Sequence, residues 1–140
     1  MAQGREIIEG LFRERQLVTI SAAFNCGKSP LLQEWAFCIA SGIDWCGHRT
    51  AHRPVIFLSH EAPEWQWLPD WQRLAVRHRV PAPHMPNMVE VYMSCGDLKD
   101  SPTAEATREV NRILPLRNTE KVAWLVSKLE TKPDAIVFID

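Results

Sequence analysis

The chain has 140 residues, of which 46% are hydrophobic and 24% are charged, and its formal net charge is −1. This composition excludes a disordered chain and gives no support to a surface that is basic throughout. No run of about 18 apolar residues is present, so we expect neither a transmembrane helix nor a membrane partner. Four cysteines without a CxxC pair favour a reducing compartment, and we expect one cytoplasmic domain over residues 1–140.

Short nonpolar, β-branched runs alternate along the chain with helical patterns. In chain order, the sequence predicts a strand at 17–21 (LVTIS), a helix at 29–40, a strand at 54–59 (PVIFLS), a helix at 63–79, a loop at 81–87 (PAPHMPN), a weaker strand at 88–94, helices at 102–114 and 118–130, and a strand at 135–139 (AIVFI). Continuous rather than alternating nonpolar strands are typical of a parallel sheet that is buried on both faces. We therefore expect an α/β fold, a three-layer sandwich with a mostly parallel sheet.

A phosphate-binding loop is predicted between the first strand and the first helix. Residues 22–29 read AAFNCGKS, which is the GxxxxGKS pattern with Ala22 in place of its first glycine. Gly27 lets the backbone approach phosphate oxygens, and successive loop N–H groups with the following helix N-terminus attract an anion. Lys28 would reach the β- and γ-phosphates, and the Ser29 hydroxyl would ligate Mg²⁺. The residues expected to contact the nucleotide are Ala23, Phe24, Asn25, Cys26, Gly27, Lys28 and Ser29.

Two residues depart from the usual form of this loop. Ala22 costs little if its φ is negative, and about 1 kcal/mol if its φ is positive. Pro30 falls in the first turn of the helix, where no N–H partner is lost. The loop is therefore altered but usable; the alternative is a chance GKS on an ordinary strand–turn–helix.

Two carboxylates follow predicted strands. Asp140 ends PDAIVFID, the Walker B pattern, and would hold Mg²⁺ through water opposite Ser29. Glu61 follows the strand 54–59 in VIFLSHEAP, and ligands of open α/β sheets bind at the carboxyl ends of the strands. Glu61 is therefore a candidate to orient and deprotonate an attacking water; the alternative is a solvated loop glutamate.

Two groups of side chains on the predicted helix 63–79 could contact nucleic acid. Trp67 and Trp71 are four residues apart, which is core spacing, and we favour a core role over stacking on bases. A basic cluster on the same helix is either a solvated face or a phosphate contact with DNA or a neighbouring subunit; its members are Arg73, Arg77, His78 and Arg79.

Three stretches resemble the RecA-like P-loop ATPases, specifically the RepA/DnaB-type replicative helicase ATPases of plasmids and phages. They are IIEGLFRERQLVTISAAFNCGKS, ASGIDWCGHRTAHRPVIFLSHEAPEW and LETKPDAIVFID, whereas residues 80–117 match only loosely. The resemblance implies ATP and Mg²⁺ as cofactors, with Lys28 as the Walker lysine, Ser29 and Asp140 at the metal and Glu61 as catalytic base. It also implies a homo-oligomeric ring that binds single-stranded DNA through later loops.

Members of this family continue after the Walker B strand with a strand that inserts beside it, next to the loop strand, and with DNA-contacting loops and an arginine finger. We therefore expect an incomplete domain with exposed strand edges, and either low stability or a partner that fills the gap; a different pairing of the strands is the alternative. The expected function is ATP binding and hydrolysis in a DNA replication or repair motor. The alternatives are a truncated or degenerate nucleotide-binding protein without turnover and a P-loop small-molecule kinase.

Overall fold

The computed structural model describes residues 4–59, 64–81, 89–93 and 118–140. Its elements are β1 (Glu6–Ile8), β2 (Phe12–Arg13), α1 (Lys28–Ser41), β3 (Val55–Ser59), α2 (Glu64–Arg77), β4 (Val89–Met93), α4 (Asn118–Thr131) and β5 (Ile136–Ile139). β1 and β2 form an antiparallel hairpin, and the main sheet has the order β4-β3-β5. β3 pairs in parallel with both of its neighbours, with Val55 opposite Val89 on one side and opposite Ile136 on the other.

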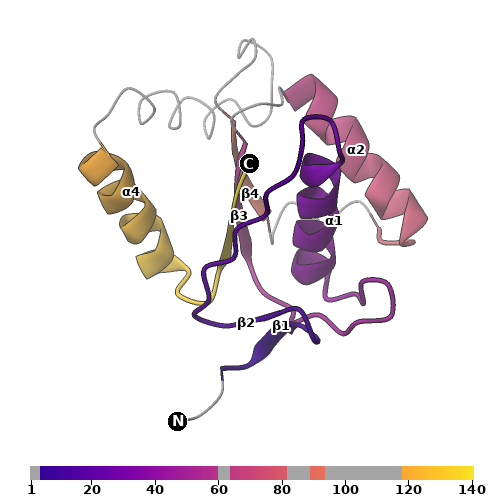
Figure 1. The fold of residues 1–140 in the computed structure, drawn as a ribbon, viewed down its shortest axis with the longest axis horizontal. Coiled ribbons are helices and arrows are strands. Elements are labelled where there is room, and N and C mark those ends of the chain that lie inside the picture. Colours follow the sequence, from indigo (N-terminus) through magenta and orange to yellow (C-terminus); the bar gives the residue numbers. More distant parts are fainter. Residues whose placement is uncertain (1–3, 60–63, 82–88, 94–117) are drawn as a thin grey trace.

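Nonpolar side chains on the two faces of β3 hold three layers together. Successive residues of a strand point to opposite faces of the sheet. Val55 and Phe57 are buried in the core on the side of α1 and α2, whereas Ile56 is buried on the side of α4 (Figure 1). The Phe57 ring stacks on Phe138 of β5, with ring centroids 5.8 Å apart. The central strand is therefore covered from both sides, as its continuous nonpolar sequence predicts.

The helix α1 contributes more buried residues to the larger core than any other described element. Its residues from Ala36 to Ala40 are buried, and the Phe37 ring meets Trp71 of α2 edge-on at 5.6 Å between centroids. The helix ends at Gly42, which has a left-handed φ of 67° and donates its N–H to the Ile39 carbonyl. Glycine adopts this conformation without steric cost, so it ends the helix where the sequence predicts.

Most predicted elements are confirmed to within two residues at each end. They are the helices at 29–40, 63–79 and 118–130 and the strands at 54–59, 88–94 and 135–139. The predicted helix at 102–114 and all but the first residue of the predicted loop at 81–87 lie outside the described residues. None of the helices in the described ranges is both long enough and apolar enough to cross a membrane.

The predicted strand at 17–21 is wrong. These residues form no strand, and Leu17 and Val18 are 97% and 49% exposed. A β-branched nonpolar run becomes a strand only beside a partner, and here a cavity separates it from β5. The β1–β2 hairpin, in contrast, was not predicted; it buries Ile7 and Ile8 and is closed by an ion pair between Glu6 and Arg13 at 3.3 Å.

Truncating Leu17 tests this difference between sequence and structure. We expect Leu17→Ala to change the free energy of unfolding by about 0.5 kcal/mol or less, because the side chain is exposed. Phe57→Ala should cost about 3–5 kcal/mol, because it removes a buried ring. Urea unfolding followed by circular dichroism measures both. A loss of more than 2 kcal/mol for Leu17→Ala would show that residues 17–21 are a buried strand after all.

Candidate nucleotide-binding site

The loop before α1 bends through two left-handed residues. Asn25 has a φ of 57° and Gly27 has a φ of 88° with a ψ of 21°. Asparagine and glycine are the residues that adopt this conformation most readily. Alternating left-handed and ordinary residues turn successive N–H groups toward a common point, which is a recurrent anion-binding geometry. From the sequence we assigned Asn25 only a contact with phosphate. An asparagine two residues before a glycine could have indicated the bend, because both residue types adopt the left-handed conformation readily.

Ala22 keeps the loop free of strain at the position where glycine is usual. It is not among the residues with a positive φ, so its Cβ causes no steric conflict. Pro30 lies in the first turn of α1, where its missing N–H leaves no helical bond unmade. Both departures from the usual pattern are therefore compatible with a phosphate-binding loop.

Backbone N–H groups at the start of α1 are available to a ligand. The first helical bond runs from the Leu31 N–H to the Gly27 carbonyl at 3.2 Å, and no side chain caps the helix. The N–H groups of Lys28 and Ser29 precede that bond, and the helix dipole adds positive potential there. Residues from Ser21 to Gly27 are exposed, so an anion can reach the loop from solvent.

Cys26 tightens the loop from inside. Its thiol donates a hydrogen bond to the Ala23 carbonyl at 2.7 Å, across the turn that Asn25 makes. Phe24, by contrast, extends its ring into solvent with 88% exposure. Of the predicted contact residues, Cys26 therefore has a structural role within the loop, whereas Phe24 packs against none of the described core residues.

Lys28 and Ser29 lie half-buried on the first turn of α1. Neither side chain has an ion pair or a hydrogen bond within the part of the chain that the structure describes. The Lys28 ammonium is therefore not engaged by a described carboxylate and is available to an incoming anion. The same applies to the Ser29 hydroxyl, whose oxygen is a suitable ligand for a hard cation.

Asp140 brings an unpaired carboxylate oxygen to the same end of the sheet. Its N–H donates to the Leu58 carbonyl at 2.8 Å, which fixes the residue directly after β5. Its Oδ2 is buried and has no hydrogen-bond partner among the described residues. A buried anionic oxygen is costly unless a cation or a donor meets it. The C-terminus and the start of α1 lie at one end of the sheet (Figure 1), and the oxygen ligands that Ser29 and Asp140 offer are of the kind that Mg²⁺ prefers.

Glu61 lies outside the described residues, two positions beyond Ser59 at the end of β3. Its role as base therefore stays a prediction. Parallel strands place their carboxyl ends at one edge of a sheet, and β3 lies next to β5. The chain thus leaves β3 at the edge where Asp140 lies.

Three of the four side chains of the basic cluster contact carboxylates of the same chain. Arg77 and His78 both contact the carboxylate of Glu34 on α1, at 3.2 Å and 3.3 Å, and Arg73 pairs with Asp70 at 2.8 Å. The two contacts with Glu34 join the end of α2 to α1, whereas the Arg73–Asp70 pair lies within α2. The sequence did not indicate the role of Glu34, because it lies 43 positions before Arg77. Trp71 is 1% exposed against Phe37, so its predicted core role is confirmed.

A family model described as an AAA domain matches residues 2–140. Neither the curated proteins nor the solved structures contain a match to this chain.

Thiol labelling tests whether the loop receives a nucleotide. Cys26 and Cys46 are both exposed, so both should react with iodoacetamide. Burial raises the pKa of Cys38 to about 12, so this thiol should not react in the folded protein. Mg–ATP at ten times its Kd should slow labelling of Cys26 by about tenfold by mass action. Mass spectrometry of the digested protein reads each site.

Cys46 is the matched control for this experiment, because it lies in a turn outside the loop. Its labelling rate should not change with Mg–ATP. Equal protection of Cys26 and Cys46, or of neither at saturating nucleotide, would contradict a binding site at residues 22–29.

Proposed function

Because this chain belongs to the AAA domain family, we propose that it binds ATP with Mg²⁺ and hydrolyses it as part of a motor that acts on single-stranded DNA. One observation carries the proposal: the uncompensated Lys28 and the free N–H groups of α1 share one end of the sheet with the buried, unpaired oxygen of Asp140. The Lys28 ammonium and the N–H groups favour an anion, whereas the Asp140 carboxylate oxygen favours a cation. A nucleoside triphosphate with a divalent cation satisfies both.

The loop would bind the polyphosphate mainly through the backbone. The N–H groups between Asn25 and Ser29 would donate to the phosphate oxygens, and the Lys28 ammonium would reach the terminal phosphates. The left-handed residues Asn25 and Gly27 turn these donors toward a common point. Backbone donors do not depend on side-chain identity, which is why Ala22 is compatible with binding.

The metal donors would be the Ser29 hydroxyl and, through water, the Asp140 carboxylate. A Mg²⁺ ion held there would supply positive charge to the phosphate oxygens during hydrolysis. The chain itself would supply these two oxygen ligands. The hydrogen bond from the Asp140 N–H to the Leu58 carbonyl holds Asp140 at the end of β5, and the first turn of α1 holds Ser29.

For hydrolysis, we assign to Glu61 the task of orienting the attacking water in line with the terminal phosphate and accepting its proton. An arginine from a neighbouring subunit would stabilise the transition state, as in ring-shaped ATPases that this chain resembles. The DNA-motor assignment rests on the same resemblance, which spans the nucleotide loop, the β3 region and the β5 region.

A nucleotide-binding protein without turnover is the second candidate. The observation that favours it is the missing strand at 17–21, since residues 16–20 lead into the loop without strand pairing. A loop whose stem is unpaired is free to bind phosphate but positions it less firmly for in-line attack.

Removing the Lys28 charge tests the binding site. Lys28→Ala should weaken ATP binding about ten- to a hundredfold, because charge-assisted hydrogen bonds contribute about 1.5–3 kcal/mol. Lys128→Ala makes the same change on α4 and should leave the ATP Kd unaltered. Isothermal titration calorimetry gives both values. Equal ATP affinity in the two variants would contradict the proposal.

Replacing Glu61 separates binding from turnover. Glu61→Gln should bind ATP like the wild type and lose hydrolysis by about a hundredfold or more, the contribution expected of a general base. Phosphate release is measured with and without a poly-dT oligonucleotide, and DNA should stimulate the wild type only. ATP binding with no turnover under any condition would favour the non-hydrolytic candidate.

A further inference from the structure

Gln33 of α1 is a polar side chain buried among nonpolar neighbours. It is 4% exposed, and Ala36 and Phe37 on the same helix are fully buried members of the larger core. Among the residues whose burial the structure describes, Gln33 is the one polar or charged side chain buried to this degree. Neither the phosphate donors nor the metal ligands described above include it.

The carboxamide of Gln33 has no hydrogen-bond partner within residues 4–59, 64–81, 89–93 and 118–140. A carboxamide offers two donors and one acceptor oxygen, and burying them unpaired lowers stability. A nonpolar side chain of the same length would avoid this loss. An unpaired buried polar group is uncommon in a folded protein, and a bound water or a catalytic task is a usual reason for one.

Gln33 lies on the same face of α1 as Ser29. The two residues are four apart, so their side chains lie one above the other, about 6 Å apart along the helix axis. Side chains on a helix lean toward its N-terminus. The Gln33 carboxamide is therefore directed toward the first turn of α1, which carries Lys28 and Ser29.

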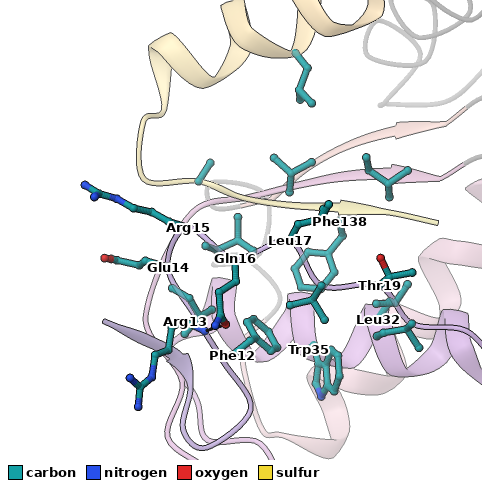
Figure 2. A pocket seen from close by; sticks show the side chains of 18 residues that line it. Phe12, Arg13, Glu14, Arg15, Gln16, Leu17, Thr19, Leu32, Trp35 and Phe138 are labelled. Atoms are coloured by element: carbon teal, nitrogen blue, oxygen red, sulfur yellow. Dashed lines mark hydrogen bonds between the residues drawn. The ribbon is translucent and has the colours of Figure 1, made fainter. Parts of the chain in front are cut away.

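The neighbours of Gln33 on α1 place this face in the interior of the protein. Phe37, four residues later, meets Trp71 of α2, and Ala36 belongs to the same core cluster as Phe57 of β3. Leu32 and Trp35 lie instead along the cavity beside β5 (Figure 2). Because the first turn of α1 lies at the carboxyl ends of the strands, Gln33 lies one turn beneath the candidate nucleotide site (Figure 1).

We propose that Gln33 is a positioning residue for ATP hydrolysis: its carboxamide holds a water beneath Ser29, and this water orients the one that attacks the terminal phosphate. The inference rests on the proposed function. A glutamine side chain spans about one helical turn, so it reaches the level of Ser29 but not the phosphates above it. A bridging water is therefore needed between the carboxamide and the attacking water.

The role of Gln33 is orientation without proton transfer. A carboxamide neither gains nor loses a proton at neutral pH, so the proton of the attacking water still passes to the general base. Holding the attacking water in line with the terminal phosphate lowers the barrier without changing how tightly ATP binds. The loss of Gln33 should consequently lower kcat and leave the ATP Kd unaltered.

Gln33→Met separates this role from a structural one, because methionine has a similar length, is unbranched and is nonpolar. We expect the Tm to rise by about 2–4 °C, since no unpaired amide is then buried. We expect kcat to fall about tenfold and the ATP Kd to stay within about twofold of the wild type. Phosphate release with and without a poly-dT oligonucleotide gives kcat, calorimetry gives the Kd, and thermal unfolding gives the Tm.

Two further variants control for effects of shape and of the substitution itself. Gln33→Leu removes the same amide with a branched side chain and should also lower kcat. Gln72→Met makes the same change at an exposed position of α2 and should leave kcat, Kd and Tm unchanged.

A second measurement does not depend on turnover. The side-chain ¹⁵NH₂ signals of Gln33 are identified by their loss in Gln33→Met. They should shift when Mg²⁺ and a non-hydrolysable ATP analogue bind to the full chain, because the water that the carboxamide holds then meets the terminal phosphate site. The side-chain signals of Gln72 should not move.

The outcomes separate this inference from the proposed function. An unchanged kcat in both Gln33 variants, a lower Tm together with a lower kcat, a weakened ATP Kd, or Gln33 signals that do not respond to the analogue would each overturn the inference and leave the proposed function standing. A wild-type chain that binds the analogue but releases no phosphate under any condition would contradict hydrolysis and the role of Gln33, but not the binding site. A chain that does not bind the analogue would contradict the inference and the proposed function together.

Discussion

Burial of β3 on both faces is the constraint on which the rest of the described structure depends. Val55 and Phe57 require cover from α1 and α2, and Ile56 requires cover from α4, so the strand fixes where all three helices pack. Pairing with β4 and β5 in parallel then brings the carboxyl ends of the strands to one edge. Because α1 packs with its first turn at this edge, the nucleotide loop and Asp140 come to the same end of the molecule.

The candidate site gains its chemistry from groups that the fold leaves unsatisfied. The N–H groups at the start of α1 have no cap, Lys28 has no anionic partner in the described structure, and one oxygen of Asp140 is buried without a donor. Of these groups, only the buried Asp140 oxygen is costly without a partner, because the loop before α1 is exposed to solvent and Lys28 is only half-buried. The loop itself carries little strain, because the left-handed positions are occupied by Asn25 and Gly27.

The sequence alone predicted those elements whose position depends on interactions between residues close together in the chain. Continuous β-branched runs predicted β3 and β5, the helical pattern from Ser29 predicted the start of α1 to within one residue, and Gly42 predicted its end. The same reasoning failed for LVTIS, because a nonpolar run shows that a segment can be buried but not that a neighbouring strand is present. The contacts of Glu34 with Arg77 and His78 depend on helix packing, which no local pattern records. The role of Glu61 stays a prediction.

The central claim is that the backbone amides from Asn25 to Ser29 bind the phosphates of ATP. A titration of the ¹⁵N-labelled chain with Mg–ATP, followed by amide chemical shifts, tests it directly. The account predicts that the largest shifts fall on Gly27, Lys28 and Ser29, that Asp140 responds only when Mg²⁺ is present, and that the amides of the β1–β2 hairpin stay in place. Saturable shifts centred on any other part of the chain, with the amides of 25–29 unmoved, would contradict it.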